Sequence, residues 1–369
     1  MVTNRRVVSL DVFRGITVAL MILVNYLAVS QVTPAMLIHA PWNGLTLADL
    51  VFPSFLFIVG VSMAYSFKKR SEQPSRVLWG HFIYRVVALF AIGVFINWIS
   101  GKMSLEGLMS VRIMGVLQLI ALASLFAALL ARSKPRWVLI AAVSLILIHS
   151  YILLAVGAPD VIPGTLTQGN TIDDWIDVQI LTPNNMYTAK TDPEGILSII
   201  PATALVLFGM FFGKNLQTRR FNRKNLGTYG GWGSLLILLG LLISTVLPIN
   251  KQLWTSSFIL ITAGIGILFL SFLYAYLDVK PRKSIFLAAL PLGRNALVIY
   301  ILSIFMAIFL HMNLFKGPSG YISVYDILSN NLINLAGETW GILLWGLLII
   351  VFWGLIAYGM YRRKIFIKL

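Results

Sequence analysis

The sequence predicts an all-α fold, a bundle of about ten transmembrane helices with both termini in the cytoplasm. The first observation is composition: 58% of the residues are hydrophobic and 11% are charged, whereas soluble domains hold roughly 45–50% and 25%. The second is that apolar stretches close to the ~20 residues that cross a ~30 Å hydrocarbon core recur along the chain. The third is that the basic residues gather in short clusters between those stretches.

The apolar stretches run through the whole chain, so residues 1–369 are predicted to form one transmembrane domain. The first stretch is too long for a signal-peptide core and carries Arg14, so we interpret it as a retained span. The ninth is long enough to tilt or kink. In chain order, the expected spans are 12–30, 48–67, 78–99, 112–131, 136–157, 195–213, 229–248, 253–277, 284–311 and 339–361.

Lysine and arginine fall unevenly on the two sides that these spans define. One side carries 21 of them, the other carries 5, and 3 lie within spans. Cytoplasmic loops carry the excess of basic residues, so the rich side, which holds both termini, is predicted to be cytoplasmic. Two longer connections lie on the other, outer side, at 158–194 and 312–338, and neither is long enough for a separate domain. The first of them is rich in aspartate and glutamate.

Composition also excludes several functions. The net charge of +16 would suggest a nucleic-acid partner in a soluble protein, but here its clusters follow membrane topology, so no nucleic acid is expected. The chain has no cysteine, which rules out a thiol nucleophile, a disulfide framework and a cysteine-ligated metal. It contains no Walker loop, no dinucleotide fingerprint and no metal-binding histidine spacing, so no metal is predicted. The absence of Asn-x-Ser/Thr sequons favours a bacterial source and hence the inner membrane.

Polar residues near the outer surface are candidates for chemistry, because polar groups at membrane depth are costly and often functional. Asn25 lies ~16 Å beyond Arg14 along the first span, toward its outer end. His39 opens a Pro- and Gly-containing turn, and the other three histidines lack such a setting. Histidine is the side chain best suited to proton transfer near neutral pH. Asp49 follows Thr46 by three residues, a pattern that also fits a helix cap.

Three arginines lie within spans, away from the cytoplasmic clusters. Arg14 shares a helix face with Asp11, which fits either an interfacial ion pair or an anion site. Arg85 is close enough to the surface to snorkel, whereas Arg294 is some ten residues into its span and is expected to face a polar cavity. Together these residues indicate a cavity with cations at its cytoplasmic end and a histidine, an asparagine and carboxylates at its outer end. Such a cavity suits a large anionic ligand that enters from the cytoplasm.

Several segments carry a family resemblance. Residues 10–15 (LDVFRG), 24–26 (VNY) and above all 39–53 (HAPWNGLTLADLVFP) resemble lysosomal heparan-α-glucosaminide N-acetyltransferase and its bacterial relatives. The resemblance covers nearly the whole chain, and the additional N-terminal region and span of the lysosomal enzyme are not expected in this protein. Weaker matches lie at 111–113, 115–118, 192–195, 250–251, 253–254 and 278–280.

The resemblance implies transfer of acetyl from cytosolic acetyl-CoA to the amine of a terminal glucosamine across the membrane. It assigns the active histidine to His39 and an active-site asparagine to Asn25, and it leaves open whether an acetyl-histidine forms. A base must deprotonate the amine, and a donor such as the Asn25 amide would stabilise the oxyanion. The nucleotide phosphates require cations, for which Arg14, Arg85 and Arg294 are candidates. Candidates for orienting the imidazole or binding the acceptor are Asp49, Asn43, Asp192 and Glu194.

Two alternatives fit the same architecture. Ten spans with buried charge are also typical of a transporter, here for an amino sugar or glycan precursor. An O-acetyltransferase of envelope polysaccharide would differ only in an acceptor pocket built from outer loops. A homodimer is a further possibility suggested by the resemblance.

Overall fold

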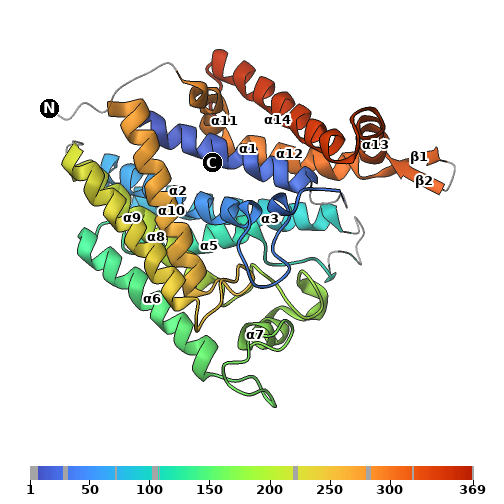
Figure 1. Ribbon diagram of the computed structural model, residues 1–369. Coiled ribbons are helices and arrows are strands. Elements are labelled where there is room, and N and C mark those ends of the chain that lie inside the picture. The colour runs from blue at the N-terminus through green and yellow to red at the C-terminus, as the bar shows by residue number, and fades with distance from the viewer. Residues whose placement is uncertain are drawn as a thin grey trace. The chain divides into compact units, whose positions relative to one another are not determined.

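A computed structural model describes residues 7–27, 32–70, 73–101, 107, 109–218, 223–279, 284–317 and 320–367 (Figure 1). The chain divides into two compact units, each described here by itself. The first unit comprises residues 1–40, 46–51 and 276–368, and the second comprises 41–45, 52–275 and Leu369. Helix α2, Leu47–Lys69, begins in the first unit and continues in the second from Phe52. That residues 1–369 act as a single domain remains a prediction.

The predicted all-α class is confirmed in the described residues, where eight helices are long and apolar enough to cross a membrane. They coincide with eight of the ten expected spans. In the fourth span the helix α5 runs only from Val116 to Ala128, which is short for a crossing. The ninth span is broken: Ile285–Arg294 and Ala296–Leu310 meet at 82°. The number of crossings and the cytoplasmic termini therefore remain predictions.

In the first unit, α1 (Val8–Leu27) packs against α11 (Leu290–Arg294), α12 (Ala296–Leu310) and α14 (Glu338–Arg362). Glycine allows the closest of these contacts. A Cβ at Gly15 would overlap the carbonyl of Ala289, and a Cβ at Gly293 would overlap the carbonyl of Asp11. Backbones that approach this closely exclude larger residues, as in other small-residue contacts between membrane helices. The start of α1 is held by Asp278, whose carboxylate accepts from the N–H groups of Val8 (2.8 Å) and Ser9 (2.9 Å).

The outer connection 312–338 contains structure that the sequence did not indicate. Strands β1 (Asn313–Gly317) and β2 (Gly320–Ser323) form an antiparallel pair, followed by α13 (Val324–Ala336), and these elements extend together from the end of α12 (Figure 1). Ser323 and Asp326 form a capping box at the start of α13.

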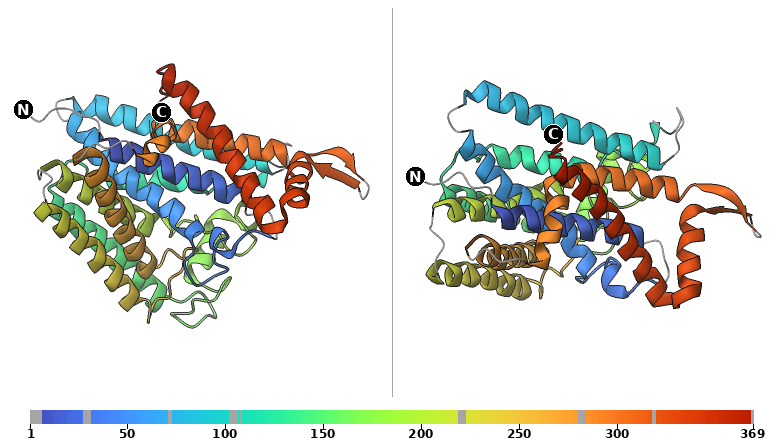
Figure 2. Two further views of the ribbon diagram at one scale, coloured as in Figure 1. Left: turned by 45° about the horizontal axis from the view of Figure 1, so that its top comes forward. Right: turned by 90° about the horizontal axis from the view of Figure 1, so that it is seen from above.

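The second unit contains the remainder of α2 together with α3 (Ser75–Ser100), α5, α6 (Pro135–Ala155), α8 (Ile199–Thr218), α9 (Arg223–Ile243) and α10 (Ser256–Tyr274). Helices α9 and α10 run side by side along their length (Figure 2). Helix α2 meets α8 through glycines, because a Cβ at Gly60 would overlap the Val206 carbonyl and one at Gly209 the Phe57 carbonyl. The outer segment of this unit carries the short helix α7 (Ile172–Leu181), capped by Thr171 and Asp174.

Candidate active site

The turn that precedes α2 brings His39 and Asp49 together in the first unit. A short 3₁₀ turn, η1 (Ala35–Leu37), leads into extended backbone at Ile38, and His39 follows. Its Nδ1 lies 2.8 Å from Oδ1 of Asp49, which is in the first turn of α2. The His39 side chain is 45% exposed, whereas that of Asp49 is 1% exposed. The pair therefore combines a buried carboxylate with an imidazole that reaches the surface of the unit.

The two oxygens of Asp49 have different roles. Oδ1 contacts the imidazole, while Oδ2 accepts from the N–H groups of Ala40 and Thr46 at 3.1 Å and from the Thr46 hydroxyl at 2.9 Å. The contacts to Thr46 are those expected of a residue in the first turn that closes a helix start. One carboxylate thus contacts both the start of α2 and His39, and its part in orienting the imidazole for catalysis remains a prediction. The helix N-terminus also favours its negative charge.

The contact determines the tautomer of His39. An ionised carboxylate only accepts hydrogen bonds, so Nδ1 carries the proton and, in the neutral ring, Nε2 carries the lone pair. A carboxylate in this position also stabilises the imidazolium that forms when Nε2 takes a proton, as in the Ser-His-Asp arrangement of hydrolases. In this tautomer, the neutral imidazole can take up a proton only at Nε2.

Asn25 lies in the last turn of α1 with its side chain exposed. Within the described residues its amide makes no hydrogen bond, so the structure joins it to neither His39 nor Asp49. Its neighbours are anchored. Tyr26 donates its hydroxyl to the Ser303 carbonyl at 2.8 Å, and Tyr325 donates to the Tyr26 carbonyl at 2.9 Å. The C-terminal end of α1 therefore presents the Asn25 side chain from a backbone that Tyr26 and Tyr325 anchor.

Arg14 and Arg294 share one buried carboxylate, that of Asp11. Arg14 Nη1 lies 3.2 Å from Oδ1 of Asp11 and 3.3 Å from the Gly293 carbonyl. Arg294 Nε lies 3.6 Å from Oδ2 of the same residue. Both guanidinium groups remain about a fifth exposed, at 22% and 23%. Helices α1 and α11 thus bring two guanidinium groups to one carboxylate.

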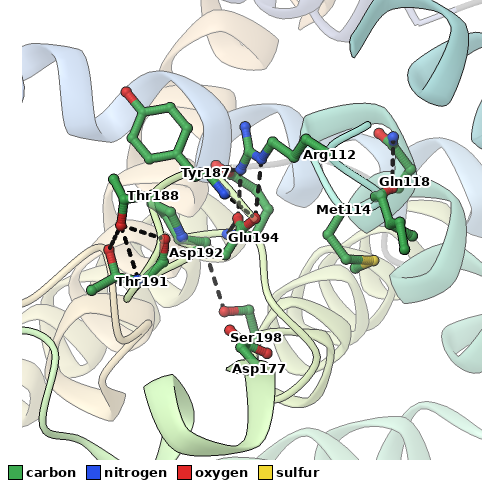
Figure 3. Close-up of polar contacts among 12 residues, drawn as sticks. Arg112, Met114, Gln118, Asp177, Tyr187, Thr188, Thr191, Asp192, Glu194 and Ser198 are labelled. Carbon is green, nitrogen blue, oxygen red and sulfur yellow. Dashed lines mark hydrogen bonds and ion pairs between the residues drawn. The ribbon is translucent and has the colours of Figure 1, made fainter. Parts of the chain in front are cut away.

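In the second unit, Arg112 joins two acidic residues of the outer segment (Figure 3). Its guanidinium contacts Asp192 through Nε (3.0 Å) and Nη2 (2.5 Å), and Nη2 also contacts Glu194 at 2.5 Å. The ring of Tyr187 lies 4.7 Å from the guanidinium carbon. Burial lowers the pKa of Arg112, but the hydrogen bonds and charges of Asp192 and Glu194 outweigh it and raise that pKa. The two carboxylates therefore favour the charged form of Arg112.

Asp177 lies in α7 beneath this cluster and is almost fully buried (Figure 3). Burial raises its pKa to about 8, against the opposing effect of the Ile196 N–H, which donates to it at 2.8 Å. The charges of Asp173 and Asp192 add to the rise. A Cβ at Gly195 would overlap Asp177, so glycine is required there. The carboxyl is therefore largely protonated at neutral pH.

The middle of the 39–53 segment belongs to the second unit and is tied to its outer turns. Nδ2 of Asn250 donates to Oδ1 of the Asn43 side chain at 3.1 Å, and the Gly44 N–H donates to the Ile249 carbonyl at 2.8 Å. The Trp42 indole donates to the Leu166 carbonyl at 2.8 Å. Asn43 thus has a structural partner, and its predicted part in acceptor binding remains a prediction.

Arg85 is exposed on α3 in the second unit, and its part in a phosphate site remains a prediction. One histidine differs from what the sequence analysis expected. His149, which had appeared to lack a setting for chemistry, is buried with Nε2 3.8 Å from Oδ2 of Asp173. Their separation of 24 residues left no signal in the sequence. Among the described residues, no group of three or more histidine or acidic side chains is arranged to hold a metal ion.

The fold and these clusters define a class: a polytopic membrane protein with a carboxylate-oriented histidine in a loop and an arginine pair on its helices. Within that class, the chain belongs to the heparan-alpha-glucosaminide N-acetyltransferase catalytic family, whose model matches residues 6–249. It is 28% identical to heparan-alpha-glucosaminide N-acetyltransferase of Homo sapiens over 426 aligned residues, covering 99% of this chain and 60% of the human protein. It is also 28% identical to the Mus musculus protein, covering 74% of this chain and 50% of the mouse protein.

The predicted family is therefore confirmed. The chain spans only 60% and 50% of the length of these two relatives.

Proposed function

We propose that this protein transfers an acetyl group from acetyl-CoA to the amine of glucosamine or of a terminal glucosamine residue. The observation that carries the proposal is the His39–Asp49 contact of 2.8 Å in a chain of an N-acetyltransferase family. Attack by an amine requires a general base, and this contact supports His39 in that role. The two relatives are named for N-acetyl transfer to heparan α-glucosaminide, which supports an amino-sugar acceptor.

In the proposed reaction, the amine nitrogen attacks the thioester carbonyl of acetyl-CoA, an N–C bond forms and the C–S bond breaks. Nε2 of His39 takes the proton that the amine loses and returns it to the departing CoA thiolate. Asp49 stabilises the intervening imidazolium. The Asn25 amide is the proposed donor to the oxyanion, a role that is typically worth about 3 kcal/mol in the transition state.

Arg14 and Arg294 are the proposed cations for the donor phosphates, since their guanidinium groups lie together at Asp11 and remain partly exposed. Arg85 stays a prediction for the same role. Asp192 and Glu194 are both bound to Arg112, which supports a role in holding the outer segment in shape. Their contact with the acceptor is a further part of the proposal, as is acetylation on the outer side of a bacterial inner membrane.

The test is mass spectrometry of glucosamine incubated with acetyl-CoA and the purified protein in detergent. We expect N-acetylglucosamine from the wild type and from His81→Ala, which removes an exposed histidine on α3. We expect none from His39→Ala. Acetylation of hydroxyl groups alone would favour an O-acetyltransferase. Binding of glucosamine without any acetylated product would favour a transporter, and full activity of His39→Ala would overturn the role of His39.

A further inference from the structure

The segment after α14 folds back onto Arg294. The guanidinium carbon of Arg294 lies 5.1 Å from the centre of the Tyr361 ring and 5.5 Å from that of the Phe366 ring. Both rings are half-buried, and they meet each other edge to face with centroids 6.2 Å apart. Such contacts with a cation hold a guanidinium in one orientation. Tyr361 and Phe366 therefore determine where the Arg294 fork points.

Asn295 fixes the same segment. Its side chain does not cap α12, although it stands at the N-cap position. Instead, its amide nitrogen donates to the Ile365 carbonyl at 3.0 Å, and its amide oxygen accepts from the Ile367 N–H at 3.1 Å. Asn295 is only 1% exposed. The donor and the acceptor of this buried amide are thus both hydrogen-bonded to the same peptide segment. These bonds tie the segment 361–367 to the break between α11 and α12.

Three consecutive basic residues lie between Tyr361 and Phe366 in the chain. Arg362, Arg363 and Lys364 are all exposed. The helix ends in a Schellman arrangement, in which the Ile365 N–H donates to the Met360 carbonyl at 2.9 Å and the Lys364 N–H to the Tyr361 carbonyl at 3.1 Å. Lys364 has φ +56°, in the left-handed region where glycine is normally favoured. A cation thus occupies a position where glycine would cost less.

We propose that the segment 361–367 forms the second half of the donor phosphate site, with Arg362, Arg363 and Lys364 binding phosphate groups of acetyl-CoA and Tyr361 and Phe366 positioning Arg294. This inference rests on the proposed function and extends it to residues outside the stretch 6–249 that the family model matches. Arg14 and Arg294 share Asp11 and so offer limited net charge to a nucleotide with three phosphates. Arg362, Arg363 and Lys364 supply the further positive charge that three phosphates require, and the rings of Tyr361 and Phe366 on either side of them lie against Arg294.

The test measures acetyl-CoA binding by calorimetry with the full chain, purified in detergent without added lipid. The variant replaces Arg362, Arg363 and Lys364 with glutamine, and a matched control replaces Lys68, Lys69 and Arg70, which form an exposed basic run at the end of α2. We expect the Kd for acetyl-CoA to rise about tenfold or more in the variant and to change less than about twofold in the control. Arg362→Lys with Arg363→Lys, which keeps all three charges, should restore most of the affinity.

Two further variants separate binding from folding. Lys364→Gly should raise the Tm, because it relieves the left-handed backbone, and yet weaken acetyl-CoA binding. Phe366→Leu should raise KM for acetyl-CoA with little change in kcat. Phe352→Leu, which alters an exposed ring on α14, should change neither.

The outcomes are distinguishable. If wild type binds acetyl-CoA, and Arg294→Gln weakens binding while the triple variant matches its control, the inference is overturned and the proposed function stands. If the triple variant binds acetyl-CoA normally but loses co-purifying phosphatidylglycerol, the phosphate belongs to lipid and the inference is also overturned. If wild type does not bind acetyl-CoA, both fail.

Discussion

At the scale of single residues, the central arrangement is one carboxylate that contacts both a helix start and an imidazole. Asp49 caps the start of α2 through Oδ2 and orients His39 through Oδ1. The spacing of Thr46 and Asp49 indicates the cap from sequence alone, because capping is local. The contact with His39, ten residues earlier, depends on the turn between them, and only the folded chain shows it.

Asp49→Asn tests this arrangement. Asparagine retains the shape, but its amide can present N–H to Nδ1, which favours the wrong tautomer, and it offers no charge to the imidazolium. We expect kcat/KM for glucosamine acetylation to fall by about 10²–10⁴-fold while the Tm changes little. Steady-state kinetics with acetyl-CoA and glucosamine measure the change. Activity within twofold of wild type would show that Asp49 only caps the helix.

Asp177 makes stability depend on pH. Its pKa is raised to about 8 in the fold from an ordinary value of 3.8, so between these values the folded chain binds a proton that the unfolded chain has released. This contribution is fully present below the unfolded pKa and is lost as pH rises through the folded one, by at most about 1.4 kcal/mol per pH unit. We expect Asp177→Asn to raise the Tm at pH 8.5 and to leave it nearly unchanged at pH 4.

The control for this series is Asp160→Asn, which neutralises an exposed aspartate of the same outer segment. Its effect on the Tm should be the same at pH 4 and at pH 8.5. Equal shifts for Asp177→Asn at pH 4 and pH 8.5 would mean that the carboxyl is already ionised in the fold.

At the scale of elements, the sequence predicts helices better than the ways in which they break. Eight apolar runs suffice to locate eight helices, because a membrane imposes a simple rule of length and polarity. The break at Arg294 and Asn295 depends on two hydrogen bonds to residues 365 and 367, some seventy positions later. The short α5 and the β1–β2 pair likewise depend on contacts that no periodic pattern records.

The contact between α1 and α11 gives a prediction at this scale. A Cβ at Gly293 would overlap the backbone of α1 at Asp11, so Gly293→Ala must push the two helices apart. We expect a drop in unfolding free energy of about 1–3 kcal/mol and weaker acetyl-CoA binding, because Arg14 and Arg294 separate. Gly354→Ala in α14, where a Cβ meets nothing, should be neutral or stabilising. Equal Tm values for the two variants would rule out the close contact.

At the scale of the whole molecule, the prediction concerns orientation. The chain has no cysteine, so labelling of a single introduced cysteine shows on which side of the membrane that position lies. In the variant Gln168→Cys, in the acidic connection 158–194, the thiol should react with a membrane-impermeant maleimide in intact cells. In the variant Ser133→Cys, in a basic connection, the thiol should react only after permeabilisation. Reaction at Ser133 in intact cells would reverse the orientation that the basic residues predict.

Family membership was within reach of the sequence, since the 39–53 segment is long and specific and the match to residues 6–249 agrees with it. A histidine or an arginine at membrane depth is costly unless it is used, so the sequence marks such residues as candidates, and their roles remain predictions. The pairing of Arg14 with Asp11 was also predictable, because residues three apart share a helix face, whereas the contacts between distant parts of the chain were not. Asp11 joins Arg14 to Arg294 across 280 residues, and Arg112 meets Asp192 and Glu194 across some eighty.

The most direct measurement is acetyl transfer in sealed proteoliposomes, with isotope-labelled acetyl-CoA outside and glucosamine trapped inside. The proposed function predicts labelled N-acetylglucosamine in the lumen with wild-type protein and none with His39→Ala. Release of unmodified glucosamine without any labelled product would contradict it and identify a transporter.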